Sequence, residues 1–240
     1  MPLPTIAVPE YTLTLPSTGK KINYRPFVVK EEKMLLMALE SGKASEMLSA
    51  MGSVVTACTD GKVNPSKSPL FDIEYLFLHL RMKSIGESVT FTIPCKECGE
   101  ECNVNFNLDS LVMKTPEEGS EKIEINNTMG LIMRYPTLEE AKKYDGKPEA
   151  EAAFGIISDC IVSVYDEEEV YSAKDYKAEE LKEFVDGLPP AAFKKITDFL
   201  EASPKLEHTL KFTCPKCKHK NEFHLEGLED FFTYTSSTTV

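Results

Sequence analysis

The sequence predicts an α+β protein, with a mostly helical body that carries several β-hairpins. Two periodicities predict this class: apolar residues recur at helical spacing in much of the chain, and shorter stretches alternate apolar and polar residues as strands do. Two C-x-x-C pairs, each between two alternating stretches, are a third observation. Close cysteine pairs of this kind indicate a small module with metal or redox chemistry.

Length and charge exclude several classes of protein. A chain of 240 residues can bury a core without needing a metal in order to fold. The formal net charge of -12 disfavours wrapping of nucleic acid or of an anionic membrane surface. The chain starts without a basic stretch followed by an apolar run, and no apolar segment approaches the roughly 18 residues of a membrane span. We therefore expect a soluble intracellular protein with no membrane partner.

The first third of the chain is expected to be a hairpin followed by helices. A Pro-Ser-Thr-Gly turn separates two alternating stretches, and the period then changes to that of helices. Gly42 is expected to end the first helix, and Cys58 lies on the apolar face of the second. The third is apolar almost all round, which predicts burial on several sides or cover by a partner. The expected elements are a hairpin over 11–27 and helices over 29–42, within 44–61 and over 68–87.

The rest of the chain returns to hairpins at two places and is otherwise expected to be helical. Residues 88–111 and 206–232 each read as strand, turn and strand, with a C-x-x-C pair at the tip. Asn126 and Asn127 predict the turn of another hairpin. From Thr137 to Pro204 the pattern is helical. The expected elements are a hairpin over 122–136 and helices over 137–144, 148–165, 174–186 and 190–202.

The two C-x-x-C hairpins predict one zinc site. A C-x-x-C turn lets two thiolates converge on one cation, and tetrahedral zinc needs four ligands, so two such turns complete a closed structural site. We expect one zinc ion per chain, bound by Cys95, Cys98, Cys214 and Cys217. The 115 residues between Cys98 and Cys214 would then be an insertion within a discontinuous zinc ribbon. The expected domains are 1–87, the ribbon from 88–111 and 206–232, the inserted region 112–205, and a loose tail over 233–240.

The two hairpins can be aligned beyond their cysteines. Phe106 and Leu108 correspond to Phe223 and Leu225, and Leu111 to Leu228, if the first turn is two residues longer. The turns also carry opposite charges, which we expect to attract one another. The acidic turn has Glu97, Glu100 and Glu101, and the basic turn has Lys216, Lys218 and Lys220.

These residues also allow assignments other than the zinc site. The pairs could be separate redox or disulfide pairs, although thioredoxin-like use expects one pair between a strand and a helix. Cys102 and His219 could be spare ligands, but we expect exposed turn residues. Cys58 and Cys160 are expected in the core, and the histidines in structural roles. Phosphate-loop, H-E-x-x-H and G-x-S-x-G motifs do not occur, so we expect no enzyme.

Several stretches together resemble one family. They are "YRPFVVKEEKMLLMALESG", "DIEYLFLHLRMKSIGE", "YSAKDYKAEELKEFVDGLP" and the C-terminal stretch that ends in Gly227, Leu228, Phe231 and Phe232. The combination is similar to the baseplate hub and hub-assembly proteins of T-even-like contractile-tailed bacteriophages. The resemblance implies a virion-assembly protein without catalytic chemistry, found in the host cytoplasm during assembly or in the tail baseplate. It implies other hub or tail proteins as partners.

Binding to proteins is also compatible with the Met-rich helices. Met34, Met37, Met47 and Met51 recur on them, and Met side chains adapt to partners, although core packing explains the same pattern. The alternative function is that of a zinc-ribbon nucleic-acid-binding protein or transcriptional adaptor, because "KFTCPKCKHK" is locally basic. The acidic opposing turn and the absence of aromatic residues between these lysines make nucleic acid the less favoured partner.

Overall fold

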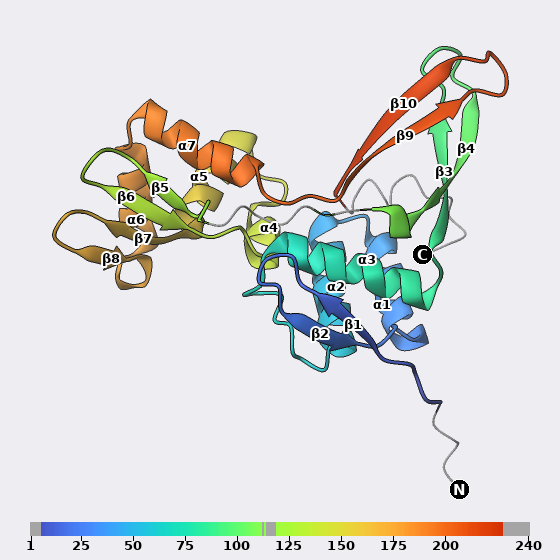
Figure 1. Cartoon of the computed structure of the whole chain (residues 1–240), viewed down its shortest axis with the longest axis horizontal. Helices are drawn as coiled ribbons and strands as arrows, with labels where there is room; N and C mark the ends of the chain where they lie inside the picture. The colour runs from blue at the N-terminus through green and yellow to red at the C-terminus, as the bar shows by residue number, and fades with distance from the viewer. Residues whose placement is uncertain (1–5, 112, 114–118, 228–240) are drawn as a thin grey trace, which may run out of the picture. The chain divides into compact units, whose positions relative to one another are not determined.

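The computed structural model describes residues 6–111, 113 and 119–227. The chain forms two compact units. The first contains Met1–Asn64, Phe71–Lys114 and Lys205–Val240, and the second contains Pro65–Leu70 and Thr115–Pro204. The fold is mixed, with helices and small antiparallel sheets (Figure 1). No helix in these described ranges is both long enough and apolar enough to cross a membrane.

The first unit begins with the hairpin and helices expected from the sequence. Strand β1 (Tyr11–Thr14) pairs antiparallel with β2 (Lys21–Tyr24). Helix α1 (Val29–Ser41) ends at Gly42, whose φ of 66° is the left-handed conformation that glycine adopts most easily. Helix α2 (Ala44–Cys58) follows. Its last residue, Cys58, is buried, and burial raises the pKa of its thiol to about 11, which confirms a core role.

Helix α3 (Leu70–Ser84) is buried on several sides, as its apolar sequence predicted. Phe77 is only 1% exposed, so this side chain belongs to the core and offers no face to a partner. Both roles expected for the methionines occur: some pack in the core and others are exposed. Met51 is buried in the core, whereas Met34 and Met37 of α1 are exposed.

An ion pair holds the segment that leads into α1. The backbone N–H of Arg25 donates to the carbonyl of Cys58 at 2.9 Å. Its guanidinium donates to the Glu31 carboxylate at 3.0 Å and to the Pro26 carbonyl at 3.0 Å. The same carboxylate accepts the N–H of Val28 at 3.0 Å, which satisfies a free donor at the helix start. We call these contacts the first arginine clasp. They connect the start of α1 to the end of α2.

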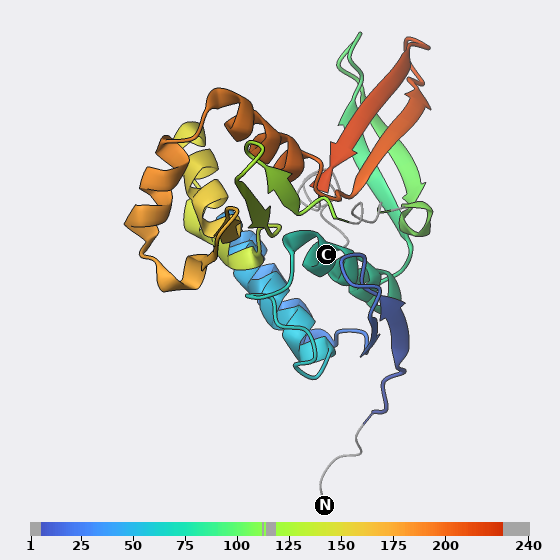
Figure 2. The same cartoon turned by 60° about the vertical axis from the view of Figure 1, so that its left-hand side comes forward.

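The two cysteine hairpins are also in the first unit. Strands β3 (Ser88–Pro94) and β4 (Glu101–Asn107) form one, and β9 (Glu207–Thr213) and β10 (Lys220–Glu226) form the other. Both are antiparallel, as predicted, and they lie side by side with their turns at the same end (Figures 1 and 2).

The predicted alignment of these hairpins is wrong. Pro94 pairs with Glu101, and Thr213 with Lys220, so the two turns have the same length. Without a gap, buried positions match: Cys102 corresponds to Asn221, and Phe106 to Leu225. The apparent two-residue shift arose because alternating strands align almost as well when displaced by one full period. Leu228, Phe231, Phe232 and the tail lie outside the described residues.

The second unit contains the correction to the predicted fold. The helix expected over 148–165 ends early, as α5 (Glu149–Cys160), and the chain continues as β7 (Ile161–Tyr165) and β8 (Val170–Ser172). The stretch "IVSVY" is rich in β-branched residues, and it pairs with a strand edge that local periodicity could not reveal. The result is a four-stranded antiparallel sheet in the order β5-β6-β7-β8.

The other elements of the second unit agree with the sequence. Strands β5 (Lys122–Glu124) and β6 (Gly130–Met133) form the predicted hairpin, and Asn126 Oδ1 accepts the N–H of Thr128 at 2.9 Å in its turn. The acidic run 166–169 forms the exposed β7–β8 turn. The predicted 174–186 helix begins as a 3₁₀ turn (Ala173–Asp175). The helices are α4 (Leu138–Tyr144), α6 (Ala178–Asp186) and α7 (Pro190–Glu201).

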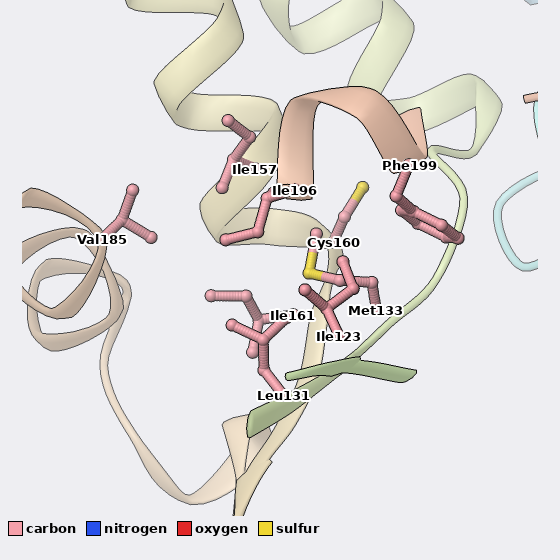
Figure 3. Close-up of a cluster of buried hydrophobic side chains, with 9 residues drawn as sticks. All are labelled: Ile123, Leu131, Met133, Ile157, Cys160, Ile161, Val185, Ile196 and Phe199. Carbon is pink, nitrogen blue, oxygen red and sulfur yellow. The ribbon is translucent and has the colours of Figure 1, made fainter. Parts of the chain in front are cut away.

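The core of this unit lies between its sheet and its helices. Ile157 and Cys160 of α5 meet Ile196 of α7 and Leu131 of β6 (Figure 3). Cys160 is fully buried, as predicted, and burial raises the pKa of its thiol to about 12. This thiol therefore stays neutral and packs as an apolar side chain.

Candidate metal centre

Four cysteines from the two hairpin tips come together in the first unit. The sulfur atoms of Cys95, Cys98, Cys214 and Cys217 all lie within 4.8 Å of one another. Two of these approaches join one hairpin to the other: Cys95 Sγ lies 3.7 Å from Cys217 Sγ, and Cys98 Sγ lies 3.7 Å from Cys214 Sγ. The four residues that the sequence singled out thus form one cluster, although they come from distant parts of the chain.

The sulfur distances are compatible with a tetrahedral cation. A zinc–sulfur bond of about 2.3 Å places the sulfurs of a regular tetrahedron about 3.8 Å apart. The two separations of 3.7 Å between the hairpins match that edge. A disulfide would require about 2.05 Å, and all seven cysteines are free thiols. The donor set can therefore hold one metal ion, and four thiolates favour a soft or borderline cation such as zinc.

Each turn has the same backbone geometry. In the first, the N–H of Cys95 donates to the Glu100 carbonyl at 2.8 Å, and Gly99 returns a bond to Cys95 at 2.9 Å. In the second, Cys214 donates to His219 at 2.9 Å, and Lys218 to Cys214 at 3.1 Å. These closed turns direct both cysteines of a pair to one side.

The turn requires a left-handed residue directly after its second cysteine. Gly99 has a φ of 71°, and Lys218 occupies the equivalent position with a φ of 62°. Glycine adopts this conformation without strain, whereas a side chain makes it less favourable. The match between these two positions supports the gapless alignment of the hairpins.

Asn221 connects the hairpins next to the sulfur cluster. Its side chain is buried; Oδ1 accepts the N–H of Lys96 at 3.0 Å, and Nδ2 lies 3.4 Å from Cys95 Sγ. Nδ2 also donates to the His219 carbonyl at 3.2 Å. Asn221 was not predicted from the sequence, because asparagine on a strand predicts no special role. The gapless alignment of the two hairpins would have indicated it, since that alignment makes Asn221 equivalent to Cys102.

Cys102 is buried beside the four cysteines, so the prediction of an exposed turn residue is wrong. It packs with Cys95, Cys214 and Phe212, and its thiol lies 3.5 Å from the Glu100 carbonyl. Burial, together with the neighbouring Cys214, raises the pKa of this thiol to about 11. His219 is exposed, as predicted.

The protonation of the cluster also favours a cation. Burial raises the pKa of Cys95, but N–H donors from Cys98, Asn221 and Glu97 outweigh it and lower the pKa to about 6. The backbone N–H of Cys217 lowers the pKa of Cys214. The pKa of Cys217 is raised to about 12, because burial and three neighbouring thiols outweigh the N–H of His219. A metal would displace the protons that remain, so metal binding would release protons.

One of the predicted charge pairs joins the two turns. Lys216 Nζ lies 2.7 Å from Glu100 Oε2. Both side chains are exposed, so the pair contributes at most about 1 kcal/mol. The other four predicted charges are exposed as well. An apolar contact is also present between the hairpins, where the rings of Phe106 and His208 are 4.5 Å apart, which gives this histidine a structural role.

Comparison with known proteins identifies the family. The family model described as T4 bacteriophage base plate protein matches residues 8–233. The chain therefore belongs to this family of phage baseplate proteins. Membership indicates a structural role in a phage tail baseplate, with other baseplate or tail proteins as partners. Comparison with curated proteins and with solved structures gave no match.

Proposed function

We propose that this protein is a subunit or assembly factor of the baseplate hub and acts by binding other tail proteins. In this proposal one zinc ion holds its two cysteine hairpins together, through Cys95, Cys98, Cys214 and Cys217. The convergence of these four thiols carries the metal part of the proposal. The family match carries the baseplate part. Assembly would begin in the host cytoplasm.

The role proposed for zinc is structural. Four cysteines complete a tetrahedral ligand shell and leave no position for a reactive water. The ion would connect β3–β4 to β9–β10, whose cysteines are separated by 115 residues of sequence. A cross-link that closes a loop of about 100 residues contributes at most about 4 to 5 kcal/mol in the chain-entropy model. Competition by protons lowers this value.

Protein binding is supported by the surface of α1. Several of the exposed large apolar side chains lie on this helix or directly before it, among them Met37 and Leu39. Exposed apolar side chains that lie close together are typical of surfaces that bind proteins. The exposed lysines of the second turn are only three, and they face an acidic turn, so nucleic acid is less favoured.

Native mass spectrometry tests both parts of the proposal in one experiment. We expect one zinc per chain, and a complex when purified hub proteins of the same phage are added. Cys214→Ser should release the zinc. Cys160→Ser is the matched control, because this cysteine is buried in the other unit, and it should keep the zinc. Equal zinc retention in both variants would remove the metal assignment, and no complex with any hub protein would remove the hub assignment.

The nucleic-acid alternative predicts a different outcome. Binding to DNA or RNA should fall steeply as salt rises and should be lost when Lys216, Lys218 and Lys220 are replaced together. Binding to a hub protein through apolar side chains should persist in salt. A salt-sensitive complex with nucleic acid that depends on these lysines would replace the hub proposal.

A further inference from the structure

The first arginine clasp has a second copy in the other unit. The N–H of Arg134 donates to the Cys160 carbonyl at 2.9 Å, as Arg25 does to Cys58. Its guanidinium donates to Glu140 at 2.8 Å and to the Tyr135 carbonyl at 3.2 Å. Glu140 then accepts the N–H of Thr137 at 2.7 Å. We call these contacts the second arginine clasp.

The elements around the two clasps correspond as well. In each unit a hairpin leads into the arginine, a helix starts two residues before the glutamate of an R-x-x-x-x-x-E spacing, and a second helix ends at a buried cysteine. The strand that precedes each arginine has the same length, Lys21–Tyr24 in one unit and Gly130–Met133 in the other. Shared contacts at equivalent positions are the mark of one module used twice.

The two copies differ in what covers the start of the first helix. In the second unit, residues 65–70 lie along this start; they form a turn, a bridge at Pro69 and the first residue of α3. Pro69 forms an antiparallel bridge with Thr137, and the N–H of Leu70 donates to the Pro136 carbonyl at 2.9 Å. Ser66 Oγ donates to Glu139 Oε1 at 3.1 Å. Thr137 is 3% exposed and Leu138 only 2%.

The equivalent positions in the first unit are open. Val28 corresponds to Thr137 and is 42% exposed, and Val29 corresponds to Leu138 and is 76% exposed. No strand or bridge pairs with residues 27–30 in the part of the chain that the structure describes. The apolar surface continues about two turns along α1, where Leu36 and Met37 are exposed.

We infer that residues 27–30 of the first unit bind a segment of another baseplate protein, in the way that residues 65–70 lie on the second unit. A backbone N–H of that segment would donate to the Phe27 carbonyl, and an apolar side chain would cover Val29. Lys30 stands where the second unit has Glu139, so the segment would carry an acidic residue in place of Ser66.

The partner segment is thus defined by its chemistry: an acidic residue and, four residues later, an apolar one. This spacing is that of Ser66 and Leu70 in the segment that covers the second unit. The inference rests on the proposed binding function, but it does not depend on the metal. A failure to find zinc or a hub complex would leave the peptide experiment below unaffected.

The test is a titration of the full-length protein, labelled with nitrogen-15, with three synthetic peptides followed by NMR. The first peptide has the sequence of residues 64–71 with Ser66→Glu. The second is the unmodified sequence, and the third carries Ser66→Glu together with Leu70→Asp. We expect the first peptide to shift the amide signals of residues 27–30 and of α1. The second should bind about tenfold more weakly, and the third should cause no shift.

Protein variants locate the site. Val29→Asp should abolish the shifts, whereas Val170→Asp, at an exposed valine of β8, should leave them unchanged. Lys30→Glu should remove the preference for the acidic peptide. Unchanged NMR spectra at millimolar peptide would overturn the inference, and so would shifts confined to residues 136–139. If the same amides shift with protein concentration alone, a second copy of this chain is the occupant and the assignment to another protein is wrong.

Discussion

Asn221 is predicted to hold the sulfur cluster in the geometry that zinc requires. Its amide makes two contacts to the opposite hairpin: it accepts from Lys96 at 3.0 Å and lies 3.4 Å from the sulfur of Cys95. Asn221→Ala removes both contacts and leaves the four cysteines in place. A neutral hydrogen bond contributes about 1 kcal/mol and one to a charged group about 1.5 to 3 kcal/mol. The expected loss is therefore about 2 to 3 kcal/mol of zinc binding.

This loss corresponds to a decrease in zinc affinity of about 10- to 100-fold, which is the range usual for residues that support metal ligands. Competition with a chromophoric chelator at constant pH measures it. Asn105→Ala is the matched control, because this asparagine is exposed on the other hairpin and accepts from Thr90 at 2.7 Å, away from the sulfur cluster.

Asn221→Asp separates the two contacts. The carboxylate can still accept from Lys96, but it cannot donate to Cys95 and adds a negative charge beside thiolates. We expect a weaker zinc complex than with alanine, and a change in the sulfur-to-metal absorption bands when cobalt replaces zinc. The reasoning would be refuted if both Asn221 variants bound zinc within twofold of the unchanged protein while the control behaved normally.

Three further predictions concern stability. Burial alone would raise the pKa of Glu140, but Arg134 and the Thr137 donors lower it to about 2. The stabilisation of the folded protein by this carboxylate is therefore complete above about pH 4.5 and is lost as pH falls toward 2. Glu140→Gln should thus cost about 2 kcal/mol at pH 7 in urea unfolding, and equal stability of the two proteins at pH 7 would contradict this. Gly155→Ala would place a methyl group in steric overlap with the Tyr144 ring, and should lower the free energy of unfolding by about 1 to 3 kcal/mol; an unchanged urea midpoint would count against the packing described. Gly99→Ala should cost about 1 kcal/mol because φ is 71° there, whereas no loss would mean that the turn relaxes.

The four cysteines that form the cluster were predictable because their signal is local. The C-x-x-C spacing and the alternating strands around it can be read from a few residues each. Asn221 and Cys102 were not predictable in the same way, since their burial depends on the opposite hairpin, which lies far away in the sequence. The misplaced alignment concealed that they are equivalent.

The fold shows the same division. Helices with apolar residues at helical spacing, such as α2, were predicted correctly because the pattern repeats over several turns. Residues 161–172 were expected partly in a helix because the apolar pattern of α5 runs on into β7 without a break. Residues 161–165 form a strand because they pair with β6. The residues of β6 lie about thirty positions earlier in the chain. The arginine clasps share only the arginine and the glutamate at fixed spacing, which is too little to find by reading the sequence.

The most direct test of the central claim is native mass spectrometry of the purified protein, with the zinc content counted per chain. The account predicts one zinc per chain, lost together with the structure of the hairpin tips when Cys214 becomes serine. A chain without metal, lighter by two hydrogens for each C-x-x-C pair, would show disulfides in place of the ion and would contradict it.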